Sequence, residues 1–188
     1  MRRRLAGKGS RLLAVPASER GQTLVEFALL APLLFIILFG IIQFGFLFGG
    51  QIGLTNAARE AARYAAVIQT GGGATAVAAA SATYSEMTAP GGYLARAIPG
   101  YQSANLVTTG PGRTAVCYIG YPNADGTFSI RVRVQVAYRH PLFVPFVGIF
   151  VDAIDGQSDN AFRVGVSEEM RVENPVLDIA AGGLPVCP

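Results

Sequence analysis

The first 70 residues are sharply divided between polar and apolar positions. Residues 1–21 are rich in Arg and Lys, and residues 27–50 form a run of 24 amino acids without a charged side chain. At a rise of about 1.5 Å per residue, such a run can cross the roughly 30 Å hydrocarbon core of a bilayer as one tilted helix. The pattern therefore predicts a single membrane-spanning helix over residues 22–50.

The charge before this run predicts its orientation. Residues 1–21 contain six basic side chains against the single acid Glu19, a net charge of +5. Because positively charged flanks stay in the cytoplasm, we expect a single-pass protein of the cytoplasmic membrane with residues 51–188 outside. A secretory signal peptide has a shorter apolar region, of about 7–15 residues. An ordinary uncleaved signal anchor remains an open alternative.

Two features of the apolar run bear on its packing. Pro32 removes one backbone hydrogen bond, so we expect a kink or a melted turn over residues 28–32. Gly45, Gly49 and Gly53 recur every four residues and form a small-residue track on which another helix could pack closely. The alternative is chance, because a chain rich in Gly and Ala makes such tracks by composition alone.

Helical periodicity continues beyond the membrane run. The stretch from residue 54 to residue 68 consists of good helix formers and places four apolar side chains and Ile68 on one face; these four are Leu54, Ala58, Ala61 and Ala65. We therefore expect one rod of about 45 residues that spans the bilayer and then covers a domain core. The glycine run at residues 71–73 ends it.

Alternation with a period of two appears in the second half of the chain. Residues 127–138 alternate apolar side chains with Ser, Arg and Gln, which predicts a strand with one buried face. Further strands are expected over residues 114–120 and 161–172, the last one antiparallel to the strand at 127–138. A short helix is expected near residues 74–87, followed by loop. The predicted class is α+β, with a small antiparallel sheet after a long helix.

Residues 141–150 form an apolar segment interrupted by two prolines. The segment is too short to cross a membrane. It could be a buried connection, or an exposed patch that contacts a partner or the outer leaflet of the bilayer. The sequence leaves these alternatives open.

Composition excludes several classes of function. The whole chain has a formal charge of +3, and without its +5 leader the remainder is at −2, so nucleic-acid binding has no support. His140 is the sole histidine and is expected in a loop, with no motif of a catalytic site nearby. Asp152, Asp155 and Asp159 miss the spacing of a calcium-binding loop. We expect no enzyme activity, no metal and no cofactor.

The two cysteines lie in the part that is expected outside the cytoplasm, where disulfides persist. A bond between Cys117 and Cys187 would close a loop of about 70 residues and tie the C-terminal segment to the domain. Two free thiols, or a bond to another chain, are the alternatives.

The boundary between the leader and the apolar run carries a single acid. Glu26 stands at the mouth of the predicted membrane helix, where desolvation of a carboxylate is costly, so it requires a partner or a role. It lies five residues after Gly21. A glycine followed at the fifth place by Glu, at the start of an apolar helix, resembles the processing site of type IV pilin-like proteins.

Several segments together resemble the TadE family, the pseudopilins of the tight-adherence (Flp-type) pilus system. The resemblance is most specific over residues 20–66 and looser over the strand at 132–138 and the late segment at 169–173. It implies a leader over residues 1–21, cleavage by a prepilin peptidase between Gly21 and Gln22, and an exported TadE-like domain over residues 51–188. The implied partners are the membrane, the peptidase, other pilin-like subunits and the Tad secretion platform.

Electrostatics also indicates a role for Glu26 in assembly that does not depend on the family; the alternative is a carboxylate that reaches the membrane interface without a partner. Cleavage would expose a positive α-amino group on Gln22, one helical turn away, and an ion pair would relieve the desolvation cost of both charges.

Because major pilins of this system look much shorter, a minor, assembly-initiating or tip subunit is the better fit. The rival interpretation is an uncleaved, membrane-anchored scaffold or binding protein of the envelope.

Overall fold

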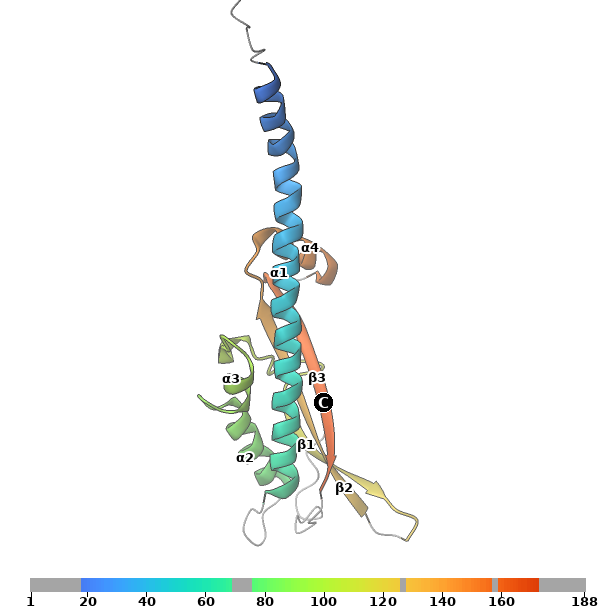
Figure 1. Cartoon of the computed structure of the whole chain (residues 1–188). Coiled ribbons are helices and arrows are strands. Elements are labelled where there is room, and N and C mark those ends of the chain that lie inside the picture. Colours follow the sequence, from blue (N-terminus) through green and yellow to red (C-terminus); the bar gives the residue numbers. More distant parts are fainter. Residues whose placement is uncertain (1–17, 69–75, 126–127, 157–158, 173–188) are drawn as a thin grey trace, which may run out of the picture. The chain divides into compact units, whose positions relative to one another are not determined.

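The computed structural model describes residues 18–68, 76–125, 128–156 and 159–172. The chain divides into two compact units, Met1–Phe39 and Gly40–Pro188. The class is α+β, as predicted. The described elements are shown in Figure 1 and follow in this order: α1 (Ser18–Val67), α2 (Ala76–Thr88), α3 (Tyr93–Ala97), the 3₁₀ turn η1 (Ser103–Asn105), β1 (Ala115–Pro122), β2 (Phe128–Pro141), α4 (Pro145–Asp155) and β3 (Ala161–Arg171).

The part of α1 in the first unit is apolar and exposed. Large side chains such as Leu29, Leu33 and Ile36 have about half or more of their surface exposed. Within the described residues α1 is the one helix with the length and hydropathy to cross a membrane. The expected melted turn is wrong: α1 continues through residues 28–32 with Pro32 inside it. One lost hydrogen bond is tolerated because the good helix formers on either side keep theirs.

The three strands form one antiparallel sheet in the order β1-β2-β3. Val134, in the middle of β2, lies opposite Val116 of β1 and Glu168 of β3. The apolar side chains that alternate along β2 are buried on one face, as predicted; these are Ile130, Val132, Val134, Val136 and Tyr138. The three strands and their antiparallel pairing were therefore predicted correctly.

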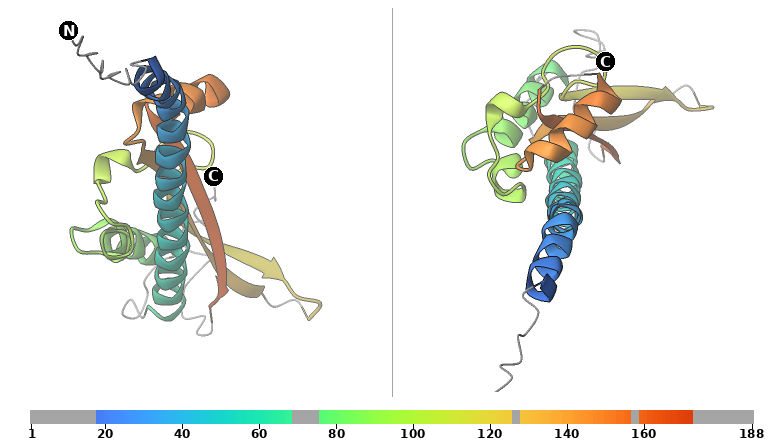
Figure 2. Two further views of the ribbon diagram at one scale, coloured as in Figure 1. Left: turned by 45° about the horizontal axis from the view of Figure 1, so that its top comes forward. Right: turned by 90° about the horizontal axis from the view of Figure 1, so that it is seen from above.

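The later turns of α1 supply the other half of the core. Leu54, Ala58, Ala61 and Ala65 are all buried, as the helical periodicity predicted. Because most side chains on this face are no larger than a methyl group, the helix backbone can approach its neighbours closely. Figures 1 and 2 show α2 and α3 beside these turns of α1, with the strands passing behind it.

Tyr118 of β1 connects the sheet to the C-terminal end of α1. Its hydroxyl donates a hydrogen bond of 2.8 Å to the carbonyl oxygen of Ala65. The last carbonyls of a helix lack partners within the helix, so this bond satisfies one of them in the buried core. Desolvation by burial raises the pKa of Tyr118 to about 12.

Two short elements occur where a loop was predicted after α2. The turn of α3 buries Leu94, and Ile98 is buried immediately after it. The 3₁₀ turn η1 follows, and the next residue, Leu106, bridges to Tyr138 of β2. The sequence signal is weak here because Gly and Pro are frequent, and tertiary contacts decide the conformation.

The apolar segment with two prolines contains the start of a helix, α4, which the sequence pattern did not indicate. Pro145 is the first residue of α4, a position where its missing N–H is not required. Gly156, with φ of 71°, ends the helix in the left-handed conformation. Asp152 and Asp155 therefore belong to a helix.

Gly53 and Gly50 are the places where α1 needs glycine. A Cβ on Gly53 would collide with the backbone carbonyl oxygen of Ala97, and one on Gly50 would lie 2.6 Å from the Cδ2 atom of His140. By contrast, a Cβ on Gly45 would meet nothing within 4 Å. The predicted small-residue track is therefore used within the chain at Gly53 and left open at Gly45.

This difference makes a matched pair of substitutions. We expect Gly53→Ala to destabilise the full chain by about 1–3 kcal/mol, because a rigid carbonyl must move to admit the methyl group. Gly45→Ala adds the same methyl group in open space and should cause no loss, since Ala is the better helix former by about 0.5–1 kcal/mol. Thermal unfolding in detergent micelles, followed by circular dichroism, measures both. Equal effects would contradict the assigned contact.

The Tyr118 hydroxyl gives a second prediction. Tyr118→Phe should cost about 1 kcal/mol near neutral pH, since the carbonyl of Ala65 loses its partner. The wild-type chain should also lose stability between pH 10 and about 12, because the unfolded phenol ionises first while the folded phenol stays protonated. The variant should lack this component. Denaturation at pH 8 and pH 11.5 tests it, and the same pH dependence in both proteins would contradict it.

Candidate functional site

The predicted processing and assembly residues lie on α1 in the first unit. Gly21, Gln22 and Glu26 are all exposed. The side-chain amide of Gln22 donates a 3.1 Å hydrogen bond to Glu26 Oε1, one helical turn away. Because the donor is a neutral amide, this contact orients the carboxylate without neutralising its charge.

The surroundings of Glu26 are apolar. Leu24, Val25 and Phe27 each expose more than half of their side-chain surface. A carboxylate among exposed apolar side chains is favourable at a membrane surface only when a cation or an interfacial position compensates it. The geometry therefore leaves the charge of Glu26 available for a cationic partner.

The bond between Gly21 and Gln22 lies near the start of α1. The helix begins at Ser18, and residues 1–17 of the predicted leader lie outside the described residues. A Cβ on Gly21 would meet nothing within 4 Å, and its φ is not positive. The fold itself gives no reason for glycine here, although glycine weakens a helix by about 0.5–1 kcal/mol relative to alanine.

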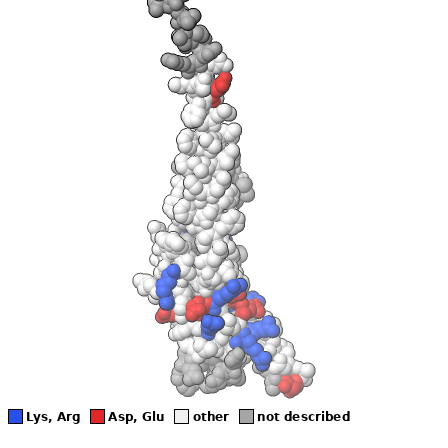
Figure 3. Space-filling model, in the orientation of Figure 1, with Lys and Arg blue, Asp and Glu red and all other residues white. Residues whose placement is uncertain are grey.

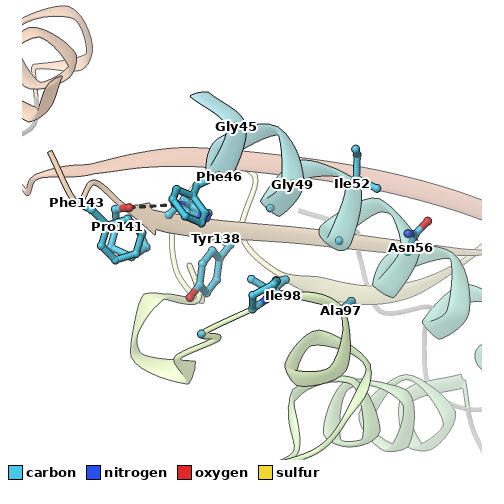
Figure 4. Close-up of a pocket in the computed structure, with 15 residues that line it drawn as sticks. Gly45, Phe46, Gly49, Ile52, Asn56, Ala97, Ile98, Tyr138, Pro141 and Phe143 are labelled. Carbon is cyan, nitrogen blue, oxygen red and sulfur yellow. Dashed lines mark hydrogen bonds between the residues drawn. The ribbon is translucent and has the colours of Figure 1, made fainter. Parts of the chain in front are cut away.

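The second group of predicted residues lies in the other unit. Gly45, Gly49 and Gly53 line one wall of a groove of about 460 Å³. Residues 97–100 and the segment from Tyr138 to Phe143 form the remaining walls, as Figure 4 shows. Gly49, like Gly45, has open space where a side chain would project, so both present bare backbone to the groove.

His140 belongs to β2 and is buried, which corrects the prediction that it lies in a loop. Its Nδ1 atom lies 3.1 Å from the carbonyl oxygen of Pro141, the dashed line in Figure 4. Its ring packs edge-on against Tyr138 and Phe143, at centroid distances of 6.4 and 6.5 Å. These contacts are those of a packed core residue. The sequence did not predict these contacts of His140 because the exact end of a strand before a proline, here Pro141, is hard to place.

Gln43 is a residue whose role the sequence reasoning missed. Only 1% of its surface is exposed, and its Oε1 atom accepts hydrogen bonds from the backbone N–H groups of Phe143 (2.9 Å) and Val144 (3.3 Å). A signal was present, because Gln43 is the only amide or hydroxyl side chain in the uncharged run. An isolated polar residue in an apolar helix usually has a partner.

The exposed sheet face carries ion pairs. Arg133 pairs with Glu169 at 2.5 Å, and Arg139 pairs with Asp159 at 3.6 Å. On the other face, Arg59 of α1 pairs with Glu168 at 3.1 Å. On the face drawn in Figure 3, charged side chains gather in a band over the strands and the later turns of α1. Exposed pairs of this kind each contribute about 0–1 kcal/mol.

The described residues also bear on metal binding and on the cysteines. Within the described ranges no three His, Cys, Asp or Glu side chains are grouped so as to hold a metal ion. Cys117, on β1, is disulfide-bonded. Cys187 lies outside the described residues, so the pairing of these two cysteines stays a prediction.

Comparison with known proteins bears on one part of the chain. Residues 21–63 match the family model described as TadE-like protein. No curated protein matches the chain, and no solved structure matches it. The family match confirms the resemblance that the sequence motifs indicated, over the segment where they were most specific. Residues 21–63, which hold Gly21, Glu26 and the apolar run, are therefore similar to the corresponding part of TadE-like proteins.

Proposed function

We propose that this chain is a pseudopilin of a tight-adherence (Flp-type) pilus, processed by a prepilin peptidase between Gly21 and Gln22. The observation that carries the proposal is the TadE-like match over residues 21–63, which includes the cleavage junction, the acid and the apolar run. Its role is structural and not catalytic. Other pilin-like subunits and the Tad secretion platform are its partners.

The glycine at the junction supports processing. Gly21 has open space around it and an ordinary helical backbone, so the fold does not select glycine there. A peptidase cleft that closes on the backbone would select it, because a missing side chain lets the scissile bond approach. Its place within the first turns of α1 favours access, since helix ends fray.

The role of Glu26 follows from charge. Cleavage converts the backbone nitrogen of Gln22 into a positive α-amino group, one turn from the carboxylate of Glu26. The contact between the Gln22 and Glu26 side chains, at 3.1 Å, supports this proximity along the helix. Pairing with this terminus, or with that of a neighbouring subunit, relieves two desolvation costs at once and favours one register as helices pack.

Membrane placement follows from the same helix. Its N-terminus lies in the cytoplasm with the +5 leader, and the domain after the apolar run lies outside the cytoplasmic membrane. The size of that domain fits a minor, assembly-initiating or tip subunit. A disulfide from Cys117 to Cys187 would hold the C-terminal segment to the sheet in this oxidising compartment.

The assembly role is tested by Glu26→Ala. We expect the variant to be cleaved like the wild type but to enter pili at least about tenfold less, the equivalent of about 1.4 kcal/mol in packing. Glu60→Ala, which removes another exposed glutamate of α1, is the matched control and should leave incorporation unchanged. Immunoblots of membrane and sheared-pilus fractions measure both steps. Normal incorporation of Glu26→Ala would exclude this role.

The processing role is tested by Gly21→Leu. The added side chain should block the peptidase and leave the leader of 21 residues attached, whereas Gly40→Leu, in equally open space on the same helix, should be cut normally. Gel mobility of the membrane-bound chain, with and without active prepilin peptidase, reports the outcome. If the wild type and Gly21→Leu both keep the size of the precursor in the presence of the peptidase, the uncleaved envelope scaffold is favoured.

A further inference from the structure

The segment that leads into α4 is hydrogen-bonded to the apolar run of α1. The N–H groups of Phe143 and Val144 both donate to the side chain of Gln43. Gln43 stands seven residues before the end of the uncharged run at residue 50. This contact therefore places the start of α4 beside a part of α1 that has the composition of a membrane span.

Aromatic contacts place α4 at the same level. The ring of Phe46 lies in the uncharged run and packs edge-on against Phe143, at a centroid distance of 5.8 Å. Both rings are largely exposed, Phe46 by 54% and Phe143 by 65%. The two side chains, labelled in Figure 4, therefore join exposed apolar area on α1 to the segment before α4.

Hydrogen bonding by Gln43 is what a lipid environment requires. Backbone N–H groups at the N-terminal end of a helix lack partners within it, and in water they are solvated freely. In hydrocarbon each unpaired group costs several kcal/mol, so a partner must come from the protein. Gln43 Oε1 supplies that partner for the N-cap residue, Val144, and for Phe143 before it, although no side chain caps α4 from its own segment.

The position of α4 is fixed at a second point. Asn160, which has a left-handed φ of 50°, donates from its side chain to the carbonyl oxygen of Leu142 at 3.1 Å. A Cβ on Gly148 would collide with the Asn160 side chain, so α4 packs tightly on this residue. The helix is therefore held against β3 on one side while other positions remain uncovered.

The uncovered positions are apolar. Ile149 exposes 66% of its surface and Ala153 is also exposed, while the acid Asp152 is partly buried in the last turns. The ion pair nearest to Ile149 in sequence joins Arg139 to Asp159. Arg139 belongs to β2 and Asp159 follows the end of α4, so neither residue of this pair is part of α4. An exposed apolar side chain on a helix that is packed on its other side is a feature by which interfacial helices bind a bilayer.

We propose that α4 lies in the membrane interface, with Phe143 and Ile149 inserted among the lipids. The leaflet is the one on the side of the membrane where the domain after the apolar run lies. The occupant of this surface is the bilayer that holds α1, because the surface includes Phe46, an exposed side chain of the apolar run. The domain is then held to the membrane at two points, α1 and α4. The inference rests on α1 crossing the bilayer and not on cleavage at Gly21.

Spin labels on the full chain test this directly. Nitroxides are attached at Ile149→Cys and, as the matched control, at Val77→Cys, an exposed apolar position on α2. The protein is placed at low density in vesicles of phosphatidylcholine and phosphatidylglycerol. Collision rates are measured with oxygen, which concentrates in lipid, and with a water-soluble nickel chelate. We expect oxygen to dominate at residue 149 and the nickel chelate to dominate at residue 77.

The other outcomes contradict the proposal in different ways. Dominant collision with nickel at both positions would place α4 in water. Exclusion of both reagents from residue 149, with spin broadening that grows with protein density, would show that a second copy covers the surface. Either result would leave the pseudopilin proposal standing, since neither depends on the N-terminal junction.

The role of Gln43 is tested in the same vesicles. Gln43→Leu preserves an apolar membrane run but removes the acceptor for Phe143 and Val144, so the label at residue 149 should become more mobile and collide less with oxygen. Gln51→Leu is the matched control, because Gln51 Oε1 has no hydrogen-bond partner in the described part of the chain. Unchanged spectra for Gln43→Leu would show that Gln43 does not position α4.

Discussion

The structure depends on one constraint, which is that a single helix must suit two environments. In the first part of α1 large side chains such as Leu33 and Phe39 are exposed, as a lipid environment favours. From Leu54 onward the inward face is built mainly of alanine and is buried under the sheet and α2. Small side chains are required there because Tyr118 must reach the carbonyl of Ala65 and the carbonyl of Ala97 must approach Gly53. The domain therefore packs on the later turns of α1, where the buried side chains are small.

The main elements were predictable because their patterns are long and their periods unambiguous. The uncharged run, the alanine face and the alternation along β2 each extend over more than ten residues, so one altered position does not hide them. The strand at β3 was predicted for the same reason. The motif at Gly21 and Glu26 was recognised from residue type and spacing, and the TadE-like match covers it.

The remainder depended on contacts between distant segments. Nothing local distinguishes Gly53, which packs on Ala97, from Gly45, which faces open space, because both belong to the same four-residue track. The helix α4 was not predicted because Pro145, usually a sign of a helix break, is here its first residue. Gln43, which accepts a hydrogen bond from the residue Phe143 just before α4, lies 100 residues earlier in the sequence. His140 was assigned to a loop because strand ends are poorly marked, yet Gly50 makes room for its ring in the core.

The central claim of this account is the proposed cleavage between Gly21 and Gln22. The intact mass of the wild-type protein, purified from membranes of cells with an active prepilin peptidase, tests this account most directly. We expect a chain that begins at Gln22, lighter by the 21-residue leader and by the two hydrogens of a bond between Cys117 and Cys187. A chain that still begins at Met1 would contradict processing and would leave the glycine at the junction and Glu26 without a function.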